Sequence, residues 1–205
     1  MTGSHSDDAL RESLIRLYSP GTPLGPPTTR ALLALYEGFG LDPRTTHPRL
    51  YESESITHLR QDAVIALFKA LRIRRGHRVL SLGEGNGAVS RLLAKSVGCR
   101  VTGVDLNSGL IASARSLAGV HGVEPLVEYF RQDVHSLRLG ERRFDRLYCH
   151  ETMCHWRDKE LALSRALALL KPGSLVGIPD SLKGAKGGVD EAMRRAPSLA
   201  SFLAP

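Results

Sequence analysis

Residues 79–87 read Val-Leu-Ser-Leu-Gly-Glu-Gly-Asn-Gly, and this stretch decides the fold class of the chain. A short apolar run comes first, three glycines follow at alternate positions, and a helical pattern occupies residues 87–97. Glycine allows positive φ and lets the backbone approach a ligand that a Cβ would obstruct. A glycine loop between a strand and a helix therefore predicts a nucleotide-type site, with a plain tight turn as the alternative.

The sequence that follows this loop alternates between short apolar runs and helical patterns. This alternation is typical of βαβ units, whose strands form a parallel sheet covered by helices on both faces. We therefore predict an α/β, Rossmann-like sheet. The expected strands are 79–82, 99–104, 126–130, 144–149 and 175–178, and the expected helices are 87–97, 108–119 and 158–170.

The sequence that precedes the sheet predicts a helical N-terminal cap over residues 1–71. Its helical patterns cover residues 5–18, 28–37 and 54–71, and a Pro/Gly-rich linker lies near 19–27. Residues 72–180 then form the sheet domain, and residues 181–205 form a short tail without a convincing strand. No strand is predicted after residue 178, so the last strands of the sheet are expected to be missing, either because the chain is incomplete or because the sheet ends early.

Acidic residues end two of the expected strands on the same side of the sheet as the glycine loop. Asp105 follows the second strand about 20 residues after the loop, where a carboxylate can accept hydrogen bonds from both ribose hydroxyls. Asp133 follows the third strand, where it can accept a hydrogen bond from the amino group of adenine. Solvated turn acids are the alternative, but open α/β sheets bind ligands at this edge.

The segment 78–180 resembles the class I S-adenosylmethionine-dependent methyltransferases, through VLSLGEGNG, VTGVDL, FRQDV, FDRLYCHETM and LKPGSLVGIPD. This resemblance implies S-adenosyl-L-methionine as the cofactor. NAD is the competing ligand, but GxGxG suits a cofactor without phosphates better than the NAD loop does. The family usually has an acid at the position of Ser81, and we expect Glu84 to supply that charge. The expected cofactor-binding residues are Ser81, Gly83, Glu84, Gly85, Gly87, Asp105, Leu106, Asp133, Val134 and His150.

Residues 149–156, Cys-His-Glu-Thr-Met-Cys-His-Trp, follow the fourth strand and are dense in reactive side chains. Four residues lie between Cys149 and Cys154, which does not match a metal-ligand spacing, so we predict no metal. The segment resembles the pocket of sarcosine- and dimethylglycine-type N-methyltransferases and of geranyl diphosphate C-methyltransferases. That resemblance makes Glu151 and His155 the candidate catalytic residues, while helix capping or loop ordering is the alternative for each.

The aromatic residues Tyr36, Tyr51 and Trp156 are the candidates for the substrate pocket, since the family's N-terminal cap closes over the substrate. Phe39 is a further candidate, and each of the cap aromatics could equally be a core residue. The resemblance implies methyl transfer to a small molecule, of a natural-product or prenyl type. A cofactor-binding protein that transfers no methyl group, serving as a structural partner or as a catalyst of another step, is the alternative.

The composition indicates which partners and which cellular compartment to expect. The 205 residues carry a net charge of +7, but the basic residues are scattered and aromatics make up only 5%, which argues against a nucleic-acid surface. No apolar run is long enough to cross a bilayer, and the N-terminus does not look like a signal peptide. Three cysteines make no disulfide framework, so we expect a cytoplasmic protein. Assembly of identical chains stays open.

Overall fold

The computed structural model describes residues 3–22, 24–56 and 60–179. A five-stranded parallel sheet lies at its centre, in the order β3-β2-β1-β4-β5. The order reverses at β1, so the crevice beside β1 is the place where such sheets bind ligands. The predicted Rossmann-like α/β architecture is confirmed. The strands are β1 (Arg78–Leu82), β2 (Arg100–Asp105), β3 (Val127–Arg131), β4 (Phe144–Cys149) and β5 (Leu170–Gly177).

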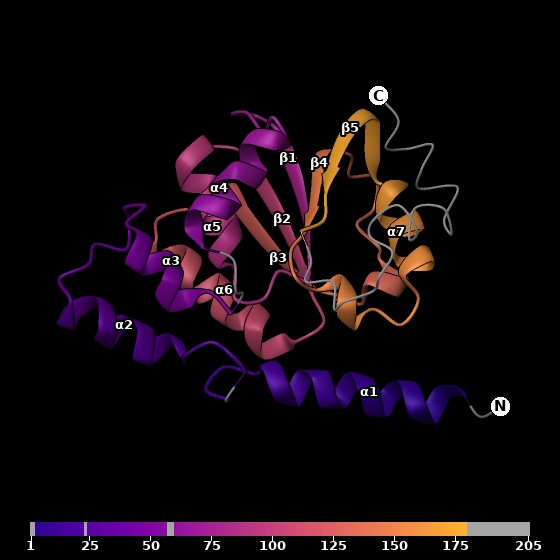
Figure 1. Cartoon of the computed structure of the whole chain (residues 1–205), viewed down its shortest axis with the longest axis horizontal. Coiled ribbons are helices and arrows are strands. Elements are labelled where there is room, and N and C mark those ends of the chain that lie inside the picture. The colour runs from indigo at the N-terminus through magenta and orange to yellow at the C-terminus, as the bar shows by residue number, and fades with distance from the viewer. Residues whose placement is uncertain (1–2, 23, 57–59, 180–205) are drawn as a thin grey trace, which may run out of the picture.

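Helices cover both faces of the sheet, as predicted (Figure 1). Val79 packs with α4 (Gln61–Ala70), α5 (Ala88–Val97) and α6 (Ser108–Val120) in one apolar cluster. Its neighbour Leu80 packs on the other face, with α7 (Lys159–Leu167). Successive strand side chains point to opposite faces, so one apolar run serves two cores. Short 3-10 helices also occur at η1 (Glu124–Leu126), η2 (Val134–Ser136) and η3 (Met153–His155).

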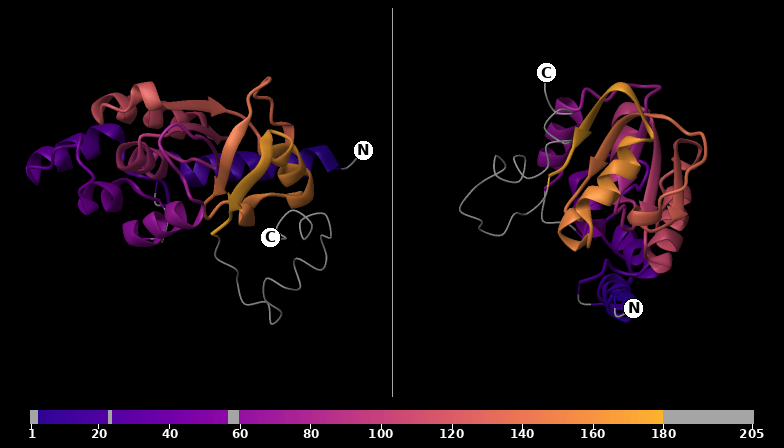
Figure 2. Two further views of the ribbon diagram at one scale, coloured as in Figure 1. Left: turned by 90° about the horizontal axis from the view of Figure 1, so that it is seen from above. Right: turned by 90° about the vertical axis from the view of Figure 1, so that its right-hand side faces the viewer.

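The N-terminal helices differ in part from the prediction. α1 (Gly3–Tyr18) and α2 (Thr29–Gly38) lie where the pattern indicated, and turns connect them. The single helix predicted over 54–71 is wrong: α3 (Pro48–Glu54) ends before Ser55, and α4 begins at Gln61. Pro48 starts α3 because its fixed φ and missing N–H suit the first helical turn. Figure 1 shows α1 running along the lower edge of the molecule, and the right-hand view of Figure 2 shows it end-on at the same edge.

The last strand begins earlier than the apolar run suggested. β5 starts at Leu170, whereas the sequence predicted helix up to residue 170 and a strand only over 175–178. Pro172 and Gly173 lie within β5, where its pairing with β4 shifts register between Phe144 and Arg146. Proline and glycine interrupt the apolar pattern but are tolerated at such irregularities. The predicted tail, 181–205, lies outside the described residues.

Two further features are the absence of a membrane-spanning helix from the described residues and the placement of the cysteines. No helix in the described part of the chain is long and apolar enough to cross a membrane. Of the three cysteines, Cys99 and Cys149 are buried in the two cores, and Cys154 is exposed.

Candidate functional site

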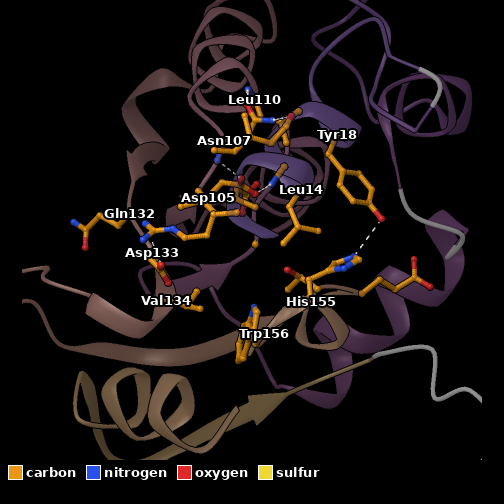
Figure 3. A pocket seen from close by; sticks show the side chains of 18 of the residues that line it. Leu14, Tyr18, Asp105, Asn107, Leu110, Gln132, Asp133, Val134, His155 and Trp156 are labelled. Carbon is orange, nitrogen blue, oxygen red and sulfur yellow. Dashed lines mark hydrogen bonds and ion pairs between the residues drawn. The ribbon is translucent and has the colours of Figure 1, made fainter. Parts of the chain in front are cut away.

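A cavity of about 900 Å³ opens at the carboxyl ends of the strands, between the sheet and α1 (Figure 3). This volume is in the range of small-molecule sites, roughly 300–1,000 Å³. Most of the residues singled out from the sequence line it together. They are Ser81, Gly83, Glu84, Gly85, Asp105, Leu106, Asp133, Val134, His150, Glu151, His155 and Trp156.

The glycine loop has the backbone that its sequence requires. Gly83, Gly85 and Gly87 have φ of 66°, 63° and 84°, which non-glycine residues rarely adopt. A Cβ at Gly83 would also lie 2.2 Å from Thr152 Oγ1, so glycine is needed there for space as well. Gly87 is the N-cap of α5 and does not line the cavity, unlike the other two.

Asp105 connects the end of β2 to the glycine loop. Its Oδ2 accepts a hydrogen bond of 2.8 Å from the Gly85 amide, and its Oδ1 accepts one of 2.8 Å from the Asn107 amide. Burial raises the pKa of Asp105 and these backbone donors oppose the rise. The side chain faces the cavity with room on its oxygens for further donors, since an ionised carboxylate accepts about four hydrogen bonds.

Asp133 lies at the other side of the cavity floor and already has two partners. Its Oδ1 lies 2.7 Å from His135 Nδ1, and its Oδ2 lies 3.2 Å from an Arg11 guanidinium nitrogen. Burial raises its pKa, but the His135 hydrogen bonds and Arg11 outweigh this and hold it below its usual value. Arg11 comes from α1, and the sequence analysis missed it because no local pattern pairs it with Asp133.

Glu84, between Gly83 and Gly85 in the glycine loop, is a buried acid, and Ser81 at the end of β1 is buried as well. Burial raises the pKa of Glu84 to about 7, although the hydroxyls of Ser81 and Ser90 and the positive charge of Arg91 lower it. Its Oε2 lies 3.5 Å from the Tyr148 hydroxyl, and among the described residues no hydrogen-bond partner meets its Oε1. An unsatisfied buried acceptor is costly. The residue therefore suits a ligand that brings a cationic or N–H donor.

The segment after β4 forms the opposite wall of the cavity. Glu151 has a φ of 48°, a strained conformation for a non-glycine residue, and its amide donates to Pro179 O at 2.9 Å. His155 ends η3, and its Nε2 lies 3.2 Å from the Tyr18 hydroxyl of α1. Figure 3 shows these two rings facing each other across the cavity, in an edge contact with centroids 5.3 Å apart. Tyr18 is a second cavity residue that the sequence analysis missed.

Two of the pocket aromatics predicted from the sequence lie elsewhere. Tyr36 and Tyr51 are 3% and 4% exposed and belong to the packed interior under α2 and α3, not to the cavity. Phe39 is exposed, below the Arg49 guanidinium. The expectation that cap aromatics reach the cavity is therefore wrong for these three residues, because α2 and α3 pack beside α5 and α6 instead of over the strand ends.

Comparisons with known proteins agree with this geometry. Residues 79–173 match the protein family described as "Methyltransferase domain". The chain is 27% identical over 146 residues to the methyltransferase GfsG of Streptomyces halstedii, which covers 71% of this chain and 50% of GfsG. It is 31% identical over 132 residues to sterol 24-C-methyltransferase ERG6 of Saccharomyces cerevisiae, covering 63% and 34%. The chain thus spans only 34% to 50% of the length of these curated relatives.

The fold also matches solved structures. A SAM-dependent methyltransferase from Geobacter sulfurreducens, in complex with S-adenosyl-L-homocysteine, superposes with a TM-score of 0.58. The identity is 22%, and the match covers 74% of this chain and 66% of the other. Residues 79–173 therefore match a methyltransferase domain, and the sheet with its glycine loop has the fold of a SAM-dependent methyltransferase.

Proposed function

We propose that this protein binds S-adenosylmethionine and transfers its methyl group to a small molecule. The observation that carries the proposal is a single cavity, which joins the glycine loop and Asp105 at one end to a tyrosine–histidine contact at the other. Ligand-binding elements and candidate proton acceptors therefore face one space. The match of residues 79–173 to a methyltransferase domain supports the same reaction class.

The cofactor is expected to lie across the strand ends, with each part opposite a matching group. The carboxylate of Asp105 suits the ribose hydroxyls, and Asp133 with Val134 suits adenine. The unsatisfied Oε1 of Glu84 suits the amino group of the methionine part. The backbone at Gly83 and Gly85 lines the cavity in a conformation that glycine adopts without strain.

The cofactor, when bound, supplies a methyl group that is already activated by the sulfonium. The protein is then required mainly to orient the acceptor and exclude water. His155 is the candidate base for an oxygen or nitrogen acceptor. In that role Nε2–H donates to the Tyr18 hydroxyl oxygen, which orients the ring, and Nδ1 is the nitrogen that takes the proton. Burial and the nearby Cys154 raise the pKa of Tyr18, so its hydroxyl stays protonated. Glu151 is the candidate for stabilising a carbocation if the acceptor is an alkene.

The walls of the cavity favour an acceptor that is largely apolar. Leu14 and Ile15 of α1 face it together with Trp156, while Arg11 and Arg157 are its cationic members. Such a lining suits an apolar body with a polar or anionic end. We place this reaction in the cytoplasm, because three cysteines make no disulfide framework.

Calorimetry with S-adenosylhomocysteine and with NAD tests the cofactor, and mass spectrometry of a metabolite extract incubated with S-adenosylmethionine tests the transfer. We expect binding of the first ligand only, and products heavier by one methyl group. Alanine at His155 should then lower turnover about 10²- to 10⁴-fold while affinity for the cofactor stays near normal. Binding of NAD alone would overturn the proposal. Cofactor binding with no methylated product from any acceptor class would favour a binding protein that transfers no methyl group.

A further inference from the structure

A buried charged cluster lies behind the glycine loop, outside the cavity. Glu54, the last residue of α3, is 2% exposed, and its Oε2 pairs with the guanidinium of Arg91, which is 1% exposed. The Tyr36 hydroxyl donates to Glu54 Oε1 at 2.5 Å, and His121 Nε2 lies 2.9 Å from the same oxygen. Side chains from α2, α5 and the C-cap of α6 therefore converge on one carboxylate.

The same cluster holds the middle of the glycine loop. Arg91 Nη1 donates to the Asn86 carbonyl at 2.5 Å, and Asn86 Nδ2 donates to the Glu54 carbonyl at 2.8 Å. Asn86 is 1% exposed, so both contacts are shielded from water. A Cβ at Gly87 would lie 2.7 Å from Arg91 Nη1, so the guanidinium also fills the space behind this residue.

The chain that leaves Glu54 then crosses the front of the loop. Ile56 lines the cavity, and its Cδ1 would lie 3.1 Å from a Cβ at Gly85. The loop is thus held between the Arg91 guanidinium on one side and Ile56 on the other. Glu54 is two residues from Ile56, so one short stretch of chain pairs with Arg91 and contacts the loop.

A second set of bonds ties this cluster to the cap. Lys95 Nζ donates to the carbonyl oxygens of Pro43 and Thr45, in the segment between α2 and α3, and lies 2.5 Å from His121 Nδ1. Burial lowers the pKa of His121, so its ring is neutral and Nδ1 can accept from Lys95. The cap segment and the loop are therefore linked through one continuous polar chain.

Stability alone does not explain such a cluster. Apolar residues of similar volume often replace a buried ion pair at no cost, because desolvation offsets the attraction between the charges. What an ion pair adds is direction: each oxygen and N–H must face its partner, so the groups can sit in only one arrangement. The group held in this arrangement is the backbone of the cofactor loop.

We propose that Glu54 and Arg91 are positioning residues, which hold Asn86 and thereby the glycine loop in the geometry that binds the cofactor. Through them the packing of α3 controls cofactor affinity, although neither side chain lines the cavity. This inference rests on the proposed function, since it assumes that the loop binds S-adenosylmethionine.

The test separates positioning from stability with a single and a double variant. Glu54→Gln leaves the Arg91 charge buried without its partner, so both stability and affinity for S-adenosylhomocysteine should fall. Glu54→Gln/Arg91→Met removes both charges, so the denaturation midpoint should return toward that of the wild type. The dissociation constant of the double variant should stay raised about tenfold or more, the scale of a lost hydrogen bond to a charged group. Glu128→Gln/Arg142→Met, at an ion pair of 3.3 Å outside the cavity, is the matched control and should bind as the wild type does.

Hydrogen exchange of the ligand-free protein gives a readout that does not depend on the cofactor. Amides of residues 83–87 should exchange about tenfold faster in the double variant, while those of β3 keep their protection. Recovery of affinity and loop protection together with stability would overturn the proposal, as would a folded Glu54→Gln variant with wild-type affinity. Failure of the wild type itself to bind would refute the proposed function, and loop exchange would still decide the positioning role.

Discussion

Two helices of the N-terminal segment are attached to the sheet domain in opposite ways. α3 is attached through Glu54 and Arg91, which are 2% and 1% exposed. α1 is attached through Arg11 and Asp133, whose side chains are 48% and 16% exposed, and through the partly buried Tyr18. Moreover, none of residues 8–18 is buried, whereas α3 buries Leu50 and Tyr51.

This difference shows which part of the cap is attached more firmly. An exposed ion pair contributes about 0–1 kcal/mol because water competes for both partners. Breaking a buried pair costs several times more, because one charge is left without a partner. α3 therefore belongs to the structural core beside the glycine loop. α1 covers the cavity through more exposed side-chain contacts and one hydrogen bond of 2.9 Å, from the buried Asn107 side-chain amide to the Ile15 carbonyl.

The buried attachment should show the largest effect. Arg91→Ala leaves the Glu54 carboxylate buried without its main partner, so the free energy of unfolding should fall by about 3–5 kcal/mol. Urea denaturation measures this value. The control Arg142→Ala removes a half-exposed guanidinium and should cost about 1 kcal/mol or less. Equal losses in the free energy of unfolding for the two substitutions would contradict the difference that we infer between buried and exposed ion pairs.

Acid should weaken the same attachment. Burial disfavours the ionised form of Glu54, but Arg91 and His121 outweigh it and lower its pKa from 4.5 to about 2. An acid with a lowered pKa stabilises the fold above its unfolded pKa, and this contribution is lost as the pH falls through the folded pKa. We expect a loss on the order of 3 kcal/mol between pH 5 and pH 2. Denaturation at several pH values should show a smaller loss in Glu54→Gln/Arg91→Met, and identical slopes would contradict the assignment.

A matched pair of tyrosines sharpens the comparison. Tyr36→Phe removes a buried hydroxyl that donates to a carboxylate, so the free energy of unfolding should fall by about 1.5–3 kcal/mol. Tyr18→Phe removes a part-buried hydroxyl next to a histidine and should cost about 1 kcal/mol or less. Thermal and urea denaturation of the two variants provide the test. A larger effect at Tyr18 would mean that α1 is anchored more firmly than its exposure indicates.

The smallest effect is expected at the exposed ion pair. Arg11→Ala should change the free energy of unfolding by about 0–1 kcal/mol, and raising the ionic strength to 1 M should abolish the difference. The measurement is urea denaturation at low and high salt. A loss of several kcal/mol that persists in salt would show that Arg11 and Asp133 form a buried anchor after all.

The sequence by itself determined the sheet and one half of the cavity. The glycine loop and the aspartates that end β2 and β3 are coded by local order, since parallel strands bring their carboxyl ends to one edge. The early start of β5 escaped prediction, because Pro172 and Gly173 interrupt its apolar run. The break between α3 and α4 was not predicted either, because the helical spacing of apolar residues continues from one helix toward the next.

Only the tertiary structure decided which cap residues meet the cavity. Tyr18 and Tyr36 both lie on amphipathic N-terminal helices, yet one faces His155 and the other faces Glu54. Glu54 and Arg91, 37 residues apart, likewise carry no local sign of their pairing. Helical periodicity defines an apolar face, but the crossing of whole helices over the sheet sets which partner that face meets. These contacts depend on packing between distant segments, which no single stretch of the sequence encodes.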